Sequence, residues 1–104
     1  LGVADDLHDE LHTSTPALYK RMESLTPALP AVSDRYIGEM LEIADTMSAC
    51  GVTSGFHEGA AELYGLLLKS PFSSERRDTV DKNRTMRQTI EACARVGTGK
   101  AAAE

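Results

Sequence analysis

The residues from Ser33 to Gly51 constrain the fold most, because apolar side chains recur there at the spacing of an α-helix. This apolar stripe consists of Tyr36, Met40, Ile43, Met47 and Cys50, with Ile37, Leu41 and Ala44 beside it. Ser33 and Asp34 are both suited to cap the first turn, and Gly51 is suited to end the helix in a left-handed conformation. We therefore predict a central amphipathic helix that is covered by more than one neighbour.

Small residues within and after this helix could allow another helix backbone to lie close to it. Gly38 lies inside it, where glycine costs roughly 1 kcal/mol relative to alanine. Two interpretations stay open for Gly38, a close contact with another backbone or a surface glycine that the fold tolerates. Gly55, Gly59 and Ala60 form a small-residue strip early in the next predicted helix, and we expect this strip to press against the central helix.

Capping and proline signals divide the rest of the chain into further helices. The predicted ranges are about 2–12, Pro16 to about 25, Thr53 or Ser54 to about Ser70, and Ser73 or Ser74 to Gly97. Pro27 and Pro30 bracket a connector, because proline cannot continue a hydrogen-bonded ladder. The short turn after Gly51 makes the helices on either side of it antiparallel neighbours.

The last predicted helix differs from the others in its charge. Its apolar stripe is thin and is interrupted by Asn83 and Arg84, so we expect it to lie outside the bundle or to reach towards a second chain; the stripe consists of Val80, Met86, Ile90 and Cys93. No segment alternates with the period of a strand. The predicted fold is therefore all-α, a compact bundle of four to five helices forming a single domain over 1–97, followed by a flexible tail over 98–104.

Composition narrows the function classes. The chain has 104 residues and a formal net charge of -5, which argues against a nucleic-acid partner. It has no signal peptide and no apolar run approaching about 18 residues, so we expect no membrane and a cytoplasmic location. Cys50 and Cys93 each fall in an apolar stripe and are interpreted as buried free thiols. The chain starts at Leu1, and we expect it to be part of a longer protein.

Few residues suggest chemistry directly. His8 and His12 are spaced to share a zinc ion on one helix face, but Asp9 stands where a metalloprotease needs glutamate, which favours a solvated acidic helix. His57 could meet a ligand carboxylate at a helix N-terminus or simply lie at the surface. Arg35 could hold an anionic ligand or pair with Glu39 one turn later.

Three runs carry a resemblance to a known family, from Arg35 to Ala44, from Cys50 to Thr53 and from Glu58 to Tyr64. Ser70-Pro71-Phe72, Thr79 and Arg84-Thr85-Met86 fit the same pattern. The chain resembles the C-terminal helical domain of phosphogluconate-dehydrogenase-like NAD(P)-binding proteins, the domain of unknown function 1932 type, within the 3-hydroxyacid dehydrogenase superfamily.

The resemblance implies the C-terminal substrate-pocket and dimerisation domain of an NAD(P)-dependent hydroxyacid dehydrogenase. Arg35, Tyr36 and Glu39 then become candidates for a pocket wall or subunit contact, and the partners are a second copy, the Rossmann domain of the parent chain and a small hydroxyacid. No lysine has the context of the family's catalytic lysine, so no catalytic, cofactor-binding or metal residue is assigned, and NAD(P) is implied only for the parent protein.

Two other functions stay open at this point. The chain could be a self-standing helical interaction module without catalysis, since four to five helices with no visible catalyst suit an adaptor. More remotely, it could be a zinc hydrolase that uses His8 and His12.

Overall fold

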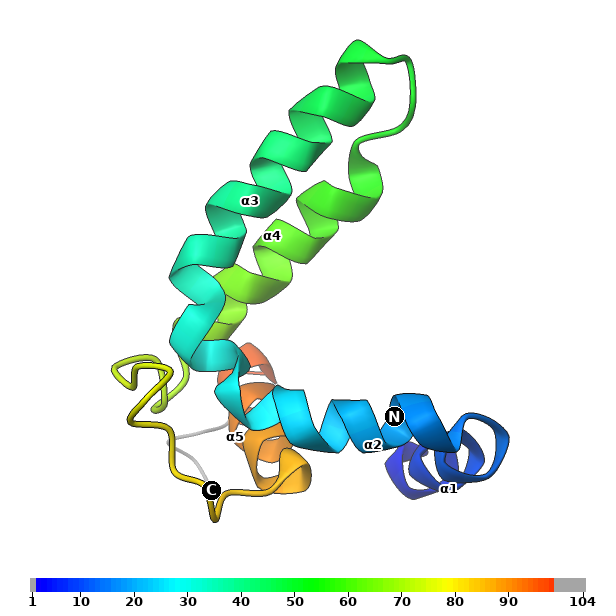
Figure 1. Cartoon of the computed structure of the whole chain (residues 1–104), viewed down its shortest axis with the longest axis vertical. Coiled ribbons are helices and arrows are strands. Elements are labelled where there is room, and N and C mark those ends of the chain that lie inside the picture. Colours follow the sequence, from blue (N-terminus) through cyan, green and yellow to red (C-terminus); the bar gives the residue numbers. More distant parts are fainter. Residues whose placement is uncertain (1, 99–104) are drawn as a thin grey trace.

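The computed structural model describes residues 2–98, and these are built from helices and turns alone, without a strand (Figure 1). The elements are α1 (Ala4–Ser14), α2 (Pro16–Leu25), a 3-10 turn η1 (Thr26–Ala28), α3 (Leu29–Ala49), α4 (Gly55–Leu67) and α5 (Met86–Thr98). The prediction of an all-α fold of four to five helices is confirmed.

The helices form two arms that meet at a corner. α3 and α4 lie side by side as an antiparallel hairpin, as predicted, while α1 and α2 form a second arm and α5 packs where the arms join (Figure 1). The radius of gyration is 15.2 Å, compared with about 13 Å for a typical globular domain of 100 residues. Two diverging arms therefore leave much of each helix surface uncovered.

The central helix begins earlier than the capping signals indicated. α3 starts at Leu29, and Pro30 occupies its first turn, where a missing N–H costs nothing. The prediction that Ser33 or Asp34 caps the helix is wrong. A connector is present, but it is the 3-10 turn η1 (Thr26–Ala28), and Pro30 already belongs to α3. Ser33 is fully buried and its hydroxyl donates a hydrogen bond of 2.7 Å to the Leu29 carbonyl oxygen, so its polar group is satisfied within the helix.

The turn after α3 follows the sequence prediction closely. Gly51 has φ of 76°, the left-handed conformation that glycine adopts without steric cost. The N–H of Val52 donates to the Met47 carbonyl at 2.9 Å and that of Gly51 to the Ser48 carbonyl at 3.0 Å, which is the Schellman arrangement. Cys50, the last residue before Gly51, is exposed, so its interpretation as a buried thiol is wrong.

The contact between α3 and α4 is made by residues other than the glycines. Ala44 and Ala61 are buried between the helices, and the rings of Tyr36 and Tyr64 meet edge to face with centroids 5.4 Å apart. An added Cβ would meet nothing within 4 Å at Gly38 or at Gly59. Gly38 is therefore a surface glycine, and the expectation that the strip containing Gly59 presses against α3 is wrong at that residue.

The last helix starts about twelve residues later than predicted and packs one face against the rest of the fold. Thr85 caps α5 reciprocally with Gln88, since each backbone N–H donates to the other's side chain, at 2.9 and 3.1 Å. Met86, Thr89, Ala92 and Cys93 are buried. The opposite face, with Arg87, Glu91 and Arg95, is exposed, so the helix lies at the outside of the fold with one face buried. It also continues through Gly97, its predicted end, to Thr98.

Two predictions lie partly or wholly beyond what the structure tests. The predicted tail falls outside the described residues except for Thr98, and the single-domain boundary stays a prediction. Within residues 2–98, no helix combines the length and apolar character needed to cross a membrane.

Candidate functional site

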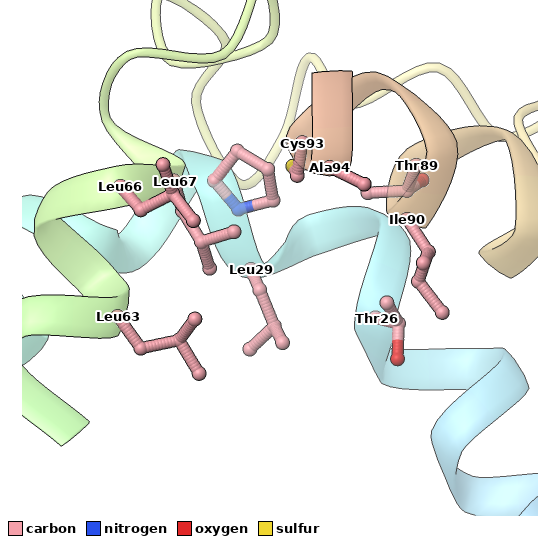
Figure 2. A pocket seen from close by; sticks show the side chains of 10 residues that line it. Thr26, Leu29, Leu63, Leu66, Leu67, Thr89, Ile90, Cys93 and Ala94 are labelled. Atoms are coloured by element: carbon pink, nitrogen blue, oxygen red, sulfur yellow. The ribbon is translucent and has the colours of Figure 1, made fainter. Parts of the chain in front are cut away.

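An open apolar groove lies where the two arms meet (Figure 2). Its volume is about 300 Å³, and η1, α3, α4 and α5 all contribute to its wall. The lining residues are Thr26, Leu29, Pro30, Leu63, Leu66, Leu67, Thr89, Ile90, Cys93 and Ala94. Carbon atoms dominate this wall, so the groove is suited to an apolar group rather than to a charged one.

Local sequence explains why the groove forms at this corner. Pro27 and Pro30 shape the passage from η1 into α3, and Pro30 itself is buried in the groove wall. On the other side, α5 approaches α4 closely at Gly97, where an added Cβ would lie 3.2 Å from a methyl carbon of Leu66. A glycine at that position therefore lets α5 pack against the end of α4.

The groove has little catalytic capacity of its own. Its one thiol, Cys93, has its pKa raised by burial, although a hydrogen bond with Ser70 and the charge of Arg84 act in the opposite direction. A thiol with a raised pKa is protonated near neutral pH, and the protonated form is a poor nucleophile. The chemistry of the wall therefore suits contact with an apolar group rather than nucleophilic attack by Cys93.

A buried arginine fastens the segment between α4 and α5 to the base of the groove. Arg84 pairs with both carboxylate oxygens of Glu75, at 3.0 and 2.6 Å, and donates to the Pro27 carbonyl at 2.8 Å. Its Nε donates to the Thr89 hydroxyl at 3.3 Å, and its guanidinium lies 3.7 Å from the centre of the Phe72 ring. One side chain thus joins η1, the connecting segment and α5.

The pKa values of Glu75 and Arg84 are shifted in the directions that their hydrogen bonds favour. The hydrogen bonds from Arg84 hold the pKa of Glu75 below its usual value against the opposing effect of burial. The pKa of Arg84 is raised by the same hydrogen bonds. Both groups are therefore charged, and hydrogen bonds within the chain engage all three nitrogen atoms of the arginine.

Arg84 was predicted only to interrupt an apolar stripe, whereas in the structure it is a buried anchor that joins three segments. Two signals in the sequence mark the correct arrangement. An arginine within an apolar stripe needs a buried acidic partner, and Thr85 with Gln88 has the capping-box spacing that starts a helix directly after Arg84.

The predicted site residues come together on the α3–α4 hairpin, outside the groove. Arg35 Nε lies 3.1 Å from Glu39, and the two side chains are 67% and 47% exposed. The Arg35 guanidinium also lies 5.5 Å from the centre of the Tyr36 ring, which meets Tyr64. The pKa of Tyr64 is raised by burial first and then by Tyr36 and Glu39. The residues thus form one cluster with an exposed cation.

The histidines have separate surroundings. His8 Nδ1 lies 3.0 Å from the Tyr19 hydroxyl, and His12 meets the edge of the same ring. Over residues 2–98, no three histidine, cysteine or acidic side chains are grouped so that they could hold a metal ion. His57 is half-buried on α4, and its Nδ1 is buried with no hydrogen-bond partner.

Comparison with known families gives one match. Residues 1–67, which include α1 to α4, match the family described as a domain of unknown function, DUF1932. The chain belongs to the DUF1932 family. Neither the curated proteins nor the solved structures contain a match to the chain. The DUF1932 match covers the cluster at Arg35 and the α4 side of the groove, while the α5 side lies beyond it.

Proposed function

We propose that this DUF1932 chain is the C-terminal substrate-pocket and dimerisation domain of an NAD(P)-dependent hydroxyacid dehydrogenase of the 6-phosphogluconate dehydrogenase type. The resemblance of the segments around Arg35, Cys50 and Glu58 supports the enzyme class. In this proposal the parent protein supplies a Rossmann domain, NAD(P) and the catalytic lysine, and works in the cytoplasm. The helical chain contributes binding surfaces and is inactive alone.

The observation that carries the proposal is the amount of apolar side chain left open on both arms. On the hairpin, Phe56 is 79% exposed and Leu63 is 58% exposed. Leu7 on α1 and Val3 just before this helix are also exposed. Exposed apolar residues spaced along a helix mark surfaces that another chain or domain covers. In this proposal, the second copy covers the apolar residues of the hairpin, and the rest of the parent chain covers those of the α1–α2 arm.

The cluster at Arg35 supplies the polar element that a hydroxyacid site needs. The Arg35 side chain is 67% exposed, and its guanidinium lies beside the Tyr36 ring and pairs with Glu39. A guanidinium can bind a carboxylate through two parallel hydrogen bonds. In the proposed enzyme, Arg35 exchanges its exposed pairing with Glu39 for the substrate carboxylate, while Tyr36 fixes its position.

The test begins with the reading frame that precedes Leu1. A strand followed by G-x-G-x-x-G there supports the proposal, and a gene without any nucleotide-binding domain contradicts it. The complete protein is then assayed for reduction of NAD or NADP with a panel of 3-hydroxyacids. We expect Arg35→Gln to raise KM more than it lowers kcat, whereas Arg21→Gln, a change at an exposed arginine of α2, leaves both unchanged.

The open groove favours a second candidate, a self-standing interaction module that binds an apolar segment of another protein. The groove is apolar and unoccupied by any described side chain, which is what helix-in-groove recognition requires. The same assay separates the candidates, because an interaction module has no turnover with any hydroxyacid and its gene encodes no nucleotide site.

A further inference from the structure

The segment that joins α4 to α5 presents two adjacent arginines. Residues 68–85 form turns without a helix (Figure 1). Arg76 and Arg77 lie in this segment and are followed by Asp78, Thr79 and Val80. The first four of these residues are exposed, and Val80 is half-buried. Two arginines placed three and two residues before a threonine, with an aliphatic residue directly after it, form a charge pattern of the kind that protein kinases select.

The side chains of the two arginines do not hold the fold together. Arg35, Arg84 and Arg87 each pair with a carboxylate of the chain. Among residues 2–98, by contrast, the guanidinium groups of Arg76 and Arg77 make no hydrogen bond and no ion pair. A guanidinium can bind a carboxylate through two parallel hydrogen bonds. A partner with an acidic cleft can therefore engage both arginines without breaking a contact of their side chains.

The hydrogen bonds of Thr79 stay within one turn. Its hydroxyl accepts a hydrogen bond of 2.8 Å from the backbone N–H of Arg76 and donates one of 3.2 Å to the Arg76 carbonyl. Its own backbone N–H donates to the same carbonyl at 2.8 Å. An exposed turn held by such local bonds opens at a lower cost in free energy than a packed helix does. The hydroxyl of Thr79 is therefore accessible to an enzyme that binds its substrate in an extended conformation.

The ends of this turn are fixed by contacts outside it. Glu75 directly precedes the two arginines, and its ion pair with Arg84 closes the loop at its base. Val80 contributes to a hollow beside Pro27, so opening of the turn has to release this apolar side chain. The turn can thus extend into a partner's cleft while Arg84 keeps the rest of the segment in place.

Other hydroxyl groups near basic residues are placed less favourably. Ser24 follows Arg21 by three residues, but it lies within α2, where its backbone is helical. Thr85 directly follows Arg84, whose three nitrogen atoms are all engaged within the chain. Thr89 is buried. The structure therefore favours Thr79 over these three positions.

We propose that Thr79 is a phosphorylation site for a protein kinase that recognises basic residues before its target. Arg76 and Arg77 bind carboxylates of the kinase cleft, and Val80 enters an apolar pocket beside them. The kinase supplies ATP with Mg²⁺. The bond between the γ-phosphorus and the oxygen of the ADP leaving group breaks, a bond from Oγ1 of Thr79 to this phosphorus forms, and the hydroxyl proton passes to a base of the kinase. The proposal goes beyond the proposed enzyme function and does not depend on it.

Phosphorylation would change the charge of this surface. A phosphothreonine carries a charge of about -1.5 to -2 near neutral pH. Arg76, Arg77 and Asp78 together carry a net charge of +1, which the phosphate changes to about -1. The modified Oγ1 no longer donates to the Arg76 carbonyl, and the two guanidinium groups gain a phosphate partner next to them. The modification therefore replaces a surface that attracts acidic partners by one that repels them.

The first experiment identifies the modified residue. The 104-residue chain is incubated with Mg²⁺, ATP and the catalytic subunit of cyclic-AMP-dependent protein kinase, and mass spectrometry locates the phosphate. We expect it on Thr79. Thr79→Val keeps the shape of the side chain without its hydroxyl and should reduce the initial rate of phosphate incorporation at least about ten-fold. Ser24→Ala is the matched control and should leave this rate unchanged.

The second experiment tests recognition separately from the hydroxyl. The double variant Arg76→Gln, Arg77→Gln retains Thr79 and should raise the KM of the kinase for the chain at least about ten-fold, with a smaller change in kcat. Arg21→Gln, which removes the arginine three residues before Ser24, should leave both values unchanged. Circular dichroism should show the native helix content in every variant.

The proposal is overturned if the chain takes up no phosphate, or if the phosphate lies on Ser24 or Thr85 instead of Thr79. It is also overturned if the folded double variant has the KM of the native chain. A parent protein without dehydrogenase activity would remove the proposed function, while the kinase measurements would still decide the role of Thr79.

Discussion

Arg84 and Glu75 form a two-pronged ion pair in which Nη1 and Nη2 of the arginine lie 3.0 and 2.6 Å from the two carboxylate oxygens. The arginine side chain is 7% exposed and the glutamate side chain is 21% exposed. A charge in such a position is tolerated only when its partner and additional hydrogen bonds are present. The pair therefore determines whether the segment between α4 and α5 stays folded against η1.

We expect Arg84→Ala to lower the free energy of unfolding by about 2–4 kcal/mol, because it leaves the Pro27 carbonyl and the Glu75 carboxylate without their donor. Urea denaturation monitored by circular dichroism measures this loss. The control is Arg35→Ala, which removes the exposed pair with Glu39 and should cost less than about 1 kcal/mol. Equal losses in the two variants contradict the role given to Arg84.

The same pair makes stability depend on pH in the acidic range. The pKa of Glu75 is lower in the folded chain than its ordinary value, so the unfolded chain binds this proton more readily. The stabilisation is therefore complete above the ordinary glutamate pKa of about 4.3 and is lost as pH falls through the lower folded value. Urea denaturation at several pH values between about 3 and 7 measures the free energy of unfolding. In this acidic range it should change less with pH for Glu75→Gln than for the native chain. Parallel profiles contradict the prediction.

The features that depend on a few neighbouring residues were predicted correctly from the sequence. The left-handed Gly51, the start of α2 at Pro16 and the antiparallel hairpin follow from backbone preferences that act over a few residues. The exposed pairing of Arg35 with Glu39 is also a local, one-turn interaction. These features were therefore accessible before any tertiary contact was known.

The features that depend on contacts between distant segments could not be predicted from the sequence. The groove joins residues of η1 to residues of α5, and the Arg84 contacts join Pro27 to Thr89, so neither follows from a local pattern. The early start of α3 also depends on tertiary packing. Ser33 is buried, and its hydroxyl is satisfied by the Leu29 carbonyl of the same helix, so it does not cap the first turn. Tertiary burial overrode local capping preference at that position.

His57 offers a way to stabilise the hairpin. Its Nδ1 is buried without a hydrogen-bond partner, which costs free energy because the atom gives up its bond to water. His57→Leu keeps an apolar group of suitable size there and should raise the free energy of unfolding by about 1 kcal/mol. Thermal denaturation at neutral pH measures the gain. His12→Leu, at an exposed position, is the control, and a gain of the same size there means that Nδ1 of His57 is not the cause.

Two glycines of the same helix hairpin should respond to alanine in opposite directions. Gly38 lies within α3, where an added Cβ meets nothing within 4 Å, so Gly38→Ala should raise stability by up to about 1 kcal/mol through helix propensity. Gly51 has φ of 76°, and Gly51→Ala should lower stability by about 1–2 kcal/mol because a Cβ clashes in the left-handed conformation. Urea denaturation of both variants measures whether each substitution raises or lowers the free energy of unfolding. A gain at Gly51 would mean that the turn has a different backbone conformation, and a loss at Gly38 would mean that this face of α3 packs closely against another part of the protein.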